Sequence, residues 1–511
     1  MQAVTELQLA QIQANGYSFS PAHYTDVAIT SPTTTTVRAL LDPTTPYERG
    51  SEPGSSAYLS HSSHHMIRTK ALQRHSWLVD PRGDAIVPIS PRAFVDGDLA
   101  INDILLSKDS NVGEVALVDE PRSIQHMRSG GVLKLRPASD PFYLFAFLKH
   151  PSFVAQLEAA TPRGSTIRHA GERWLDCVIP LPNQRDSDDV VAYVSAMTEA
   201  IADKERLIRE RTREIHRTIG DELRRGRRWR SRPHTMPSIH EIAARGRFDA
   251  AIYDREYKGI IDLVDAYEHG AQTPNEAGFD VNPGPTLELK VIKTRIDSDE
   301  PRPGYYALLL PKNLSEYGTI NRLQYLGTAA QLPLLQDGDV LFGEAGFHKG
   351  RSVVLVQAPA HCTTNAHGIY ARHRERDLDA AIMFRCIFDW YREMGVVDLV
   401  AVGGSGGHLS PSYFDEYIRV PNFSREIRER IVPLYHTGDR VGRGLPLAPG
   451  ELARRHRERN AQLGIWELSA DRALLIRILR ELQAAIVRGE PVDLAGFADV
   501  DDLSRSPESI F

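Results

Sequence analysis

One group of residues has the spacing of a metal-dependent nuclease site. Asp280 is followed by Glu288 and Lys290, with one residue between the last two. In such a site, paired carboxylates hold Mg²⁺ while the lysine positions a water molecule. However, residues 287–292 also alternate in polarity, which is typical of an ordinary strand, and the first half of the chain has no clear counterpart. We favour the strand and keep the nuclease as an alternative.

Two further patterns could bind small ligands. His61, His64, His65 and His75 lie close together, and imidazoles at this spacing can bind a metal. Their surroundings are rich in serine and lack adjacent acidic or cysteine ligands, so we predict polar loop histidines and no metal site. Residues 403–407 are glycine-rich but lack the Gly-Lys-Ser/Thr ending of a phosphate-binding loop.

The motifs of catalysis on DNA are also missing from the sequence. There is no Asn/Asp-Pro-Pro-Tyr/Phe methyltransferase motif and no Walker A sequence. We therefore predict a non-catalytic chain without a cofactor of its own.

Composition indicates an ordinary globular protein. With 511 residues, 41% of them hydrophobic and 25% charged, the chain can hold two or three domains. Its three cysteines are far apart, which argues against a disulfide framework. No apolar run approaches the ~20 residues that span a bilayer, and the N-terminus lacks a signal-peptide pattern. We expect a cytoplasmic protein with no membrane partner.

The charge distribution leaves DNA binding open. A net charge of −6 counts against a stand-alone basic DNA-binding protein, but a phosphate contact needs only one basic face. A cluster of arginines spans residues 224–232. It indicates either a solvated helix end or a contact with phosphates or a partner.

The elements that would position these residues occur twice. The segment 103–118 is echoed by 339–356, and the first aspartates differ by 339 − 103 = 236 positions. Gly164 and Ser165 lead to Pro182 as Gly404 and Ser405 lead to Pro421, an offset of 421 − 182 = 239. A fainter echo joins 19–24 to 248–253. Such a repeat predicts two similar globular units, each of which recognises a similar ligand or site.

Each unit mixes strands and helices. Residues 104–107 and 115–118 are apolar and β-branched enough for strands around a polar turn that ends in glycine. Apolar stripes predict helices over 142–160 and 378–394. The fold class is therefore α+β.

A long amphipathic helix separates the two units. Apolar residues recur at helical spacing from Val190 to Leu223, opposite a charged face. At 1.5 Å per residue, such a helix reaches roughly 50–60 Å. It needs a partner to cover its stripe, and the apolar stripe of 470–488 supplies one in an antiparallel arrangement. Between Pro421 and the stripe of 470–488 lie an irregular stretch and the charged segment 451–459. They predict that the second helix is interrupted.

This order of elements resembles the specificity subunit of type I restriction–modification systems. In that family a recognition domain often opens near an Arg-x-Asp-Ala-x-x-Tyr element, which Arg247–Tyr253 fits. Each domain carries an Asp-Ile/Val-Leu strand, a glycine-containing turn and an apolar strand, as at 103–118 and 339–356, and ends near a proline. The resemblance covers about 1–435, whereas 436–468 departs from it.

The resemblance implies two target-recognition domains, at 1–183 and 235–422, separated by a helical spacer at 184–234. A C-terminal helical region spans 423–511. The two domains would be related by a pseudo-two-fold axis, and long antiparallel helices would join them. A rigid helix holding two readers at a fixed separation suits a bipartite DNA site, because spacing along DNA is measured in helical turns.

The resemblance also implies partners and contact residues. Adenine-specific DNA methyltransferase subunits would dock on the long helix, and a motor-nuclease subunit would join in restriction complexes. These partners would bind S-adenosylmethionine, ATP and Mg²⁺. We expect the helix to contact its partner through Val194, Met197, Ile201, Ile208 and Ile215. Double-stranded DNA would be contacted from matched turns, by residue types that donate to phosphates or base edges: Lys108, Ser110, Asn111 and Arg168 in the first unit, and His348, Lys349, Arg351, Ser405 and His408 in the second.

The leading hypothesis is a DNA-specificity subunit with two reading domains. The alternatives are a scaffold of a related defence complex that does not read DNA, and the nuclease built on Asp280, Glu288 and Lys290.

Overall fold

The computed structural model describes residues 9–14, 29–81, 83–95, 99–120, 126–160, 169–225, 236–403, 406–439, 441 and 449–494. The chain forms two compact units. Unit 1 comprises residues 1–206, 444–458 and 474–500, and unit 2 comprises residues 207–443, 459–473 and 501–511. Of the weakly similar segments 19–24 and 248–253, the first lies outside the described residues.

Unit 1 contains three small sheets. A four-stranded sheet has the order β2-β8-β5-β6, a three-stranded sheet has the order β4-β3-β7, and β1 pairs with β9. The strands are β1 (Thr34–Thr36), β2 (Tyr47–Arg49), β3 (His64–Ile67), β4 (Ile86–Ile89), β5 (Ile104–Ser107), β6 (Val115–Leu117), β7 (His126–Arg128), β8 (Val132–Leu135) and β9 (Val178–Pro180).

Unit 2 contains three sheets of related order. Two four-stranded sheets have the orders β11-β18-β15-β16 and β12-β14-β13-β17, and β10 pairs with β19. The strands are β10 (Ala271–Gln272), β11 (Phe279–Pro283), β12 (Ile296–Ser298), β13 (Tyr306–Leu308), β14 (Gln324–Gly327), β15 (Val340–Gly343), β16 (Ser352–Val354), β17 (Cys362–Thr363), β18 (Gly368–His373) and β19 (Val420–Pro421).

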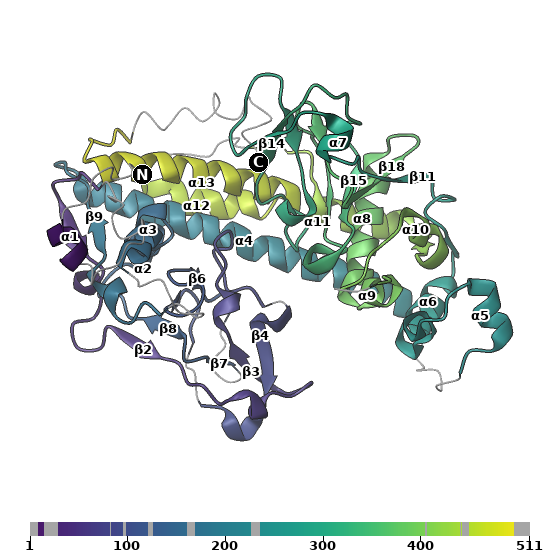
Figure 1. The fold of residues 1–511 in the computed structure, drawn as a ribbon, viewed down its shortest axis with the longest axis horizontal. Helices are drawn as coiled ribbons and strands as arrows, with labels where there is room; N and C mark the ends of the chain where they lie inside the picture. The colour runs from purple at the N-terminus through teal and green to yellow at the C-terminus, as the bar shows by residue number, and fades with distance from the viewer. Residues whose placement is uncertain are drawn as a thin grey trace. The chain divides into compact units, whose positions relative to one another are not determined.

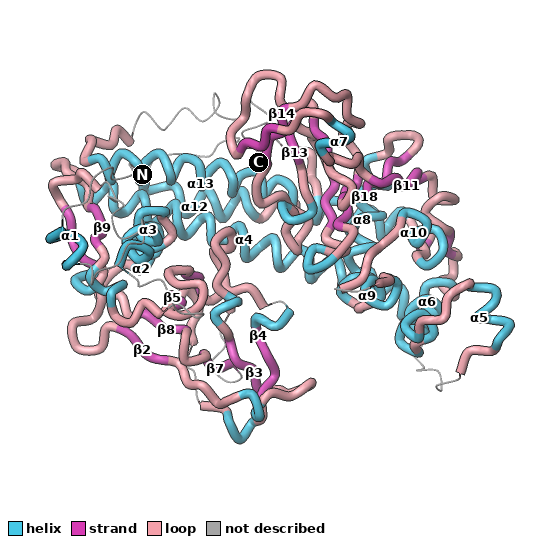
Figure 2. Tube along the Cα trace, viewed as in Figure 1, coloured by secondary structure: helices cyan, strands magenta, loops and turns pink. Residues whose placement is uncertain are grey.

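The strand pairing repeats from one unit to the other. The order β2-β8-β5-β6 becomes β11-β18-β15-β16 in unit 2, and every pair in both sheets is antiparallel. In the second sheet β3 pairs with β4 antiparallel and with β7 parallel, as β13 does with β14 and β17. Among the strands that the structure describes, unit 2 differs by the addition of β12 at the edge of that sheet. This repeated topology confirms the predicted duplication of one α+β fold. Figure 1 labels many of these strands, and Figure 2 draws the strands in magenta.

The alternation of side chains along the central strand explains how each unit builds its core. Successive residues of a strand point to opposite faces of the sheet. On β15, Val340 and Phe342 pack with helix residues of unit 2, whereas Leu341 packs with Tyr325 and Cys362 of the second sheet. In unit 1, Leu105 takes the place of Leu341 and packs with Ile67 of β3. An apolar strand buried on both faces therefore lies at the centre of each unit.

The helices of unit 1 correct one prediction. Instead of one helix over 142–160, there are two, α2 (Pro141–Leu148) and α3 (Pro151–Ala160). Proline cannot donate the backbone hydrogen bond that a helix interior requires, so Pro151 begins a new helix. The Asp140 carboxylate caps α2 by accepting from the Phe142 N–H at 2.8 Å. The remaining short helix is α1 (Leu9–Ala14).

Unit 2 carries more helices, which are shown in Figure 1. The predicted helix over 378–394 is confirmed as α8 (Leu378–Glu393). The prediction of a strand over 287–292 is wrong, because this segment forms the short helix α7 (Leu289–Ile292). The others are α5 (Ile239–Arg245), α6 (Arg255–Asp265), α9 (Val396–Val400), α10 (Pro411–Tyr417) and α11 (Arg425–Tyr435).

The long helix is confirmed as α4 (Ser187–Arg224), with 38 residues. Its first part belongs to unit 1 and its last part to unit 2. The five residues expected to contact a methyltransferase are all buried inside the chain: Val194, Met197, Ile201, Ile208 and Ile215. The apolar stripe is therefore covered by the protein's own core, and direct contact with a partner must come from other residues.

The second long helix is α13 (Ile465–Arg488), preceded by α12 (Pro449–Asn460). In unit 1, Gln184, just before α4, exchanges hydrogen bonds with the backbone of Val492, just after α13. In unit 2, Arg211 of α4 donates to the carbonyl oxygens of Asn460 and Ala461, just before α13. This order of contacts is that of an antiparallel pair, as predicted. The charged segment 451–459 is itself helical.

Two further features bear on the class of protein. Within the described ranges, no helix is long and apolar enough to cross a membrane. All three cysteines are buried thiols without disulfide bonds.

Candidate nucleic-acid interface

The duplicated aspartates form the same turn in both units. The Asp103 carboxylate accepts from the Ala100 N–H at 2.7 Å and lies 2.9 Å from Lys134 Nζ. The Asp339 carboxylate accepts from the Gln336 N–H at 2.8 Å and lies 2.6 Å from Arg372.

The residue before each aspartate has a positive φ, 69° at Asn102 and 81° at Gly338. Asparagine and glycine tolerate this conformation. The aspartates therefore shape the turn that enters the central strand, and they have a structural role.

After the central strand, both units close a turn with matched backbone hydrogen bonds. In unit 1 the Gly113 N–H donates to the Ser107 carbonyl at 2.9 Å. In unit 2 the Gly350 N–H donates to the Gly343 carbonyl at 2.9 Å. Both glycines have a positive φ, which favours glycine over residues with a Cβ. We call residues 108–114 and 344–351 the matched turns.

A second loop of each unit lies against its matched turn. The Ala170 N–H donates to the Lys108 carbonyl, and the Leu409 N–H donates to the Glu344 carbonyl, each at 2.9 Å. The offsets are 344 − 108 = 236 and 409 − 170 = 239, the same two offsets that the sequence repeat gives. The duplication therefore extends to individual hydrogen bonds at this surface.

Each matched turn holds an exposed histidine beside a carboxylate. In unit 1, His169 Nδ1 lies 2.7 Å from Asp109 Oδ1, and the histidine side chain is 62% exposed. In unit 2, His408 Nδ1 lies 3.6 Å from Glu344 Oε1, and the side chain is 53% exposed. The two histidines differ by 408 − 169 = 239 positions. With Nδ1 facing the carboxylate, Nε2 is the ring nitrogen that can meet a ligand.

Unit 2 has one more imidazole at this carboxylate. His367 Nδ1 lies 2.8 Å from Glu344 Oε2, and its side chain is also largely exposed. Two imidazoles on one carboxylate provide several hydrogen-bond donors and acceptors on one small surface.

The predicted DNA contacts fall into three groups. Ser110 and His408 are exposed on the matched turns or beside them. Arg168 and Ser405 lie outside the described residues. The other five are half-buried: Lys108, Asn111, His348, Lys349 and Arg351.

Several half-buried candidates hold the turns in place. In unit 1, the Asn111 amide donates to the carbonyl oxygens of Thr69 and Leu72, at 2.9 and 2.8 Å. In unit 2, Lys349 is 9% exposed and lies 2.7 Å from the Asp398 carboxylate, and Arg351 lies 2.5 Å from Glu316. These contacts show that Asn111, Lys349 and Arg351 help to position the turns, and their contact with DNA stays a prediction.

Both carboxylates of the nuclease alternative are paired with a cation. The Asp280 carboxylate lies 2.9 Å from Arg374, and Glu288 lies 2.6 Å from Lys290 of the same α7 segment. In the described part of the chain, no group of three or more His, Cys, Asp or Glu side chains has the arrangement of a metal site. The geometry gives the nuclease alternative no support.

Two of the four histidines predicted to lie in a loop are on a strand instead, whereas His61 and His75 lie outside the strands and helices as predicted. His64 and His65 lie on β3, where His65 stacks on His126 of β7 with ring centroids 5.2 Å apart. His64 packs edge-on against Phe94. These contacts account for the two residues as parts of a sheet.

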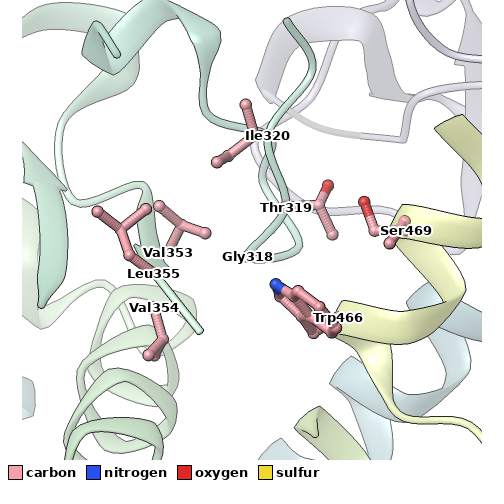
Figure 3. A pocket seen from close by; sticks show the side chains of 9 residues that line it. Gly318, Thr319, Ile320, Val353, Val354, Leu355, Trp466 and Ser469 are labelled. Atoms are coloured by element: carbon pink, nitrogen blue, oxygen red, sulfur yellow. The ribbon is translucent and has the colours of Figure 1, made fainter. Parts of the chain in front are cut away.

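Figure 3 shows a narrow cleft in unit 2. The Trp466 side chain points toward the backbone of Gly318, and Val353 and Leu355 line the other side. Its volume of about 10 Å³ holds roughly one water molecule. The cleft is therefore too small for a nucleotide or S-adenosylmethionine.

Comparisons with known proteins give structural likenesses only. No protein-family model and no curated protein sequence matches the chain. The chain is similar in structure to the S subunit of a type I restriction–modification system from M. genitalium. The identity is 12%, the match covers 90% of this chain and 96% of the other, and the TM-score is 0.38.

Two further structures are similar over most of their length. The HsdS subunit from Thermoanaerobacter tengcongensis is 14% identical, with 89% of this chain and 96% of the other covered and a TM-score of 0.26. A chain from a study of assembly and conformational transition of the type I R-M system is 13% identical, with 89% and 97% covered and a TM-score of 0.26. At TM-scores this low the backbones do not superpose closely, and the function proposed below depends on the chain's own two units.

Proposed function

We propose that this chain is the DNA-specificity subunit of a type I restriction–modification complex and reads a target in two separate halves. The observation that carries the proposal is the pair of matched turns. The loop against each turn presents an exposed histidine near a carboxylate, and the two histidines occupy equivalent positions of a repeated fold. Two copies of one recognition surface in one chain suit a bipartite DNA target, and the repeated motif at 103–118 and 339–356, which resembles the specificity subunits, contains these turns.

The chemistry of the turns fits DNA. Exposed imidazole and hydroxyl groups can donate to phosphate oxygens or to base edges. In unit 1 these groups are His169 and Ser110, and in unit 2 they are His367 and His408. A surface of this kind reads sequence through a few short contacts and does not require a basic chain, which agrees with the net charge of −6.

Selection of bound duplexes from a random DNA pool by the full-length chain tests the proposal. The expected motif has two conserved halves separated by a spacer of constant length. His169→Ala should lower affinity on the order of tenfold through one half only, and His408→Ala through the other, since a good base contact contributes about 1–3 kcal/mol. The control His240→Ala removes an exposed histidine of α5, a segment outside the matched turns and the loops against them, and should leave affinity unchanged. Enrichment of a single undivided motif, or of none, would contradict the proposal.

In this proposal the subunit is not catalytic, and a partner subunit supplies the methyltransferase activity. We expect adenine-specific methyltransferase subunits, and in restriction complexes a motor-nuclease subunit, to supply S-adenosylmethionine, ATP and Mg²⁺ binding. The purified chain should neither cleave nor methylate DNA with all three present, and a methyltransferase partner should restore methylation. Mg²⁺-dependent cleavage that Glu288→Ala abolishes would favour the nuclease instead.

A further inference from the structure

The matched turn of unit 2 carries the most exposed large apolar side chain of the described residues. Phe347 is 97% exposed, at the centre of the short 3-10 helix Gly346–His348. An aromatic side chain left in water loses the stabilisation that burial provides. Folding of unit 2 therefore gives no reason for phenylalanine at this position, and a ligand contact would give one.

The turn of unit 2 differs from that of unit 1 at this place. From the end of the central strand to the next strand the chain advances 352 − 343 = 9 positions in unit 2, but 115 − 107 = 8 positions in unit 1. The extra residue falls in the segment that projects Phe347, whereas the tip of the unit 1 turn carries Ser110. The two units therefore share the strands on both sides of the matched turn and differ at the tip of the turn.

Contacts on both sides hold the base of this turn. Lys349 binds the Asp398 carboxylate at 2.7 Å and donates to the Gly406 carbonyl. Gly346 lies beside Gly406, where a Cβ on Gly406 would be in ordinary van der Waals contact with the Gly346 Cα, at 3.5 Å. A tip that is anchored on both sides presents its aromatic ring with little loss of conformational entropy on binding.

We infer that Phe347 makes an apolar contact with a base in the DNA half-target that unit 2 reads, an inference that rests on the proposed function. Phenylalanine recognises DNA in two ways, by contact with a thymine methyl group and by insertion between base steps. Both contacts need an apolar ring that projects beyond the protein surface, and neither needs a positive charge.

The groups around Phe347 favour DNA over a protein partner. The loop that lies against the turn carries the exposed imidazole of His408, and a second imidazole, His367, shares the Glu344 carboxylate. Protein-docking aromatics lie in well-packed apolar centres, whereas the other exposed apolar side chain of these loops is Val402. A single ring among hydrogen-bonding groups is the arrangement of a base contact flanked by polar contacts.

Phe347→Ala in the full-length chain tests the inference. Its duplex affinity should fall on the order of tenfold or more, because a wrong base pair in a specific site costs about 1–3 kcal/mol. Selection from random DNA should show the loss of base preference at one or two neighbouring positions of one half-target. The dependence of affinity on salt should not change, since an apolar contact releases no counterions. Phe347→Leu, which keeps an apolar group, should retain part of the preference.

A matched control removes another exposed apolar side chain of the same unit. Ile296 is 53% exposed on the edge strand β12, and Ile296→Ala should leave affinity and motif unchanged. If the wild-type chain selects a split motif and Phe347→Ala selects the same motif with the same affinity, the inference is wrong and the proposed function stands. If the wild-type chain selects no split motif, both are wrong. Circular dichroism should show an unchanged fold, because Phe347 contributes no buried surface.

Discussion

Replacement of Asp389 by alanine is expected to lower the free energy of unfolding by about 3–5 kcal/mol, the cost of leaving a buried charge without its partner. Asp389 is fully buried on α8, 3.2 Å from Arg385 and 3.0 Å from Arg392 of the same helix. His216, on the part of α4 that belongs to unit 2, lies 2.9 Å away. The Asp389 carboxylate thus interacts with side chains from two helices. Urea unfolding followed by circular dichroism measures the decrease in the free energy of unfolding.

The buried position of Arg385 explains why the loss of Asp389 should be costly. Its side chain is 1% exposed and has no room to move toward water, since a Cβ on Gly318 would already lie 2.5 Å from its Cζ. Arg392 keeps a second carboxylate, Glu316, when Asp389 is lost. The uncompensated charge in Asp389→Ala therefore belongs mainly to Arg385.

The same cluster gives a pH dependence. Burial by itself would raise the pKa of Asp389, but Arg385, Arg392 and His216 hold the pKa well below its usual range. Because the folded pKa lies below the unfolded value of about 3.9, the stabilisation is present above about pH 4 and is lost as the pH falls toward the folded pKa. The difference in stability between wild type and Asp389→Ala should therefore shrink in acid.

Asp280→Ala is the matched control for this measurement. Asp280 also pairs with an arginine of unit 2, but the pair is half exposed, and exposed pairs contribute about 0–1 kcal/mol. A loss of less than about 1 kcal/mol in Asp389→Ala, equal to that of the control, would contradict the assignment of Asp389 as the centre of a buried charge cluster.

The parts of the fold that the sequence predicts well are those with a strong local pattern. The strand at 104–107, the helix at 378–394 and the long helix beginning near 187 all follow from apolar spacing. The repeat adds information that no single segment holds, because matched aspartates and glycines at constant offsets indicate the same turn in both units.

The errors arise where tertiary contacts outweigh local pattern. Pro151 divides an apolar stripe that is continuous in sequence. The alternation at 287–292 is too short to separate a strand from the single helical turn that forms there. Ile201 and Ile208 look like a free stripe in sequence, but the chain's own core covers them.

The sequence predicts where the matched turns of the proposed site lie, but it identifies only some of the residues that the proposal uses. The turns at 108–114 and 344–351 follow from the repeat, and His408 is among the predicted contacts. His169 could have been found by applying the offset of 239 to His408, a signal present in the sequence. Phe347 could not, because sequence gives no measure of exposure, and phenylalanine is more often buried.

Methylome sequencing of the host with and without this gene tests the central claim most directly. The loss of a specificity subunit removes the recognition step completely, so the expected effect is the disappearance of one class of methylated adenines rather than a partial decrease. Those adenines should lie in a target of two conserved halves separated by a spacer of constant length, since the proposed function assigns one half to each unit of the chain.

Restoring the gene should restore the modification, and restoring it as Phe347→Ala should relax one half of the target. The account predicts a split methylated target that is present with the gene and absent without it. An identical set of methylated adenines in both strains, in a host that carries the partner methyltransferase, would contradict it.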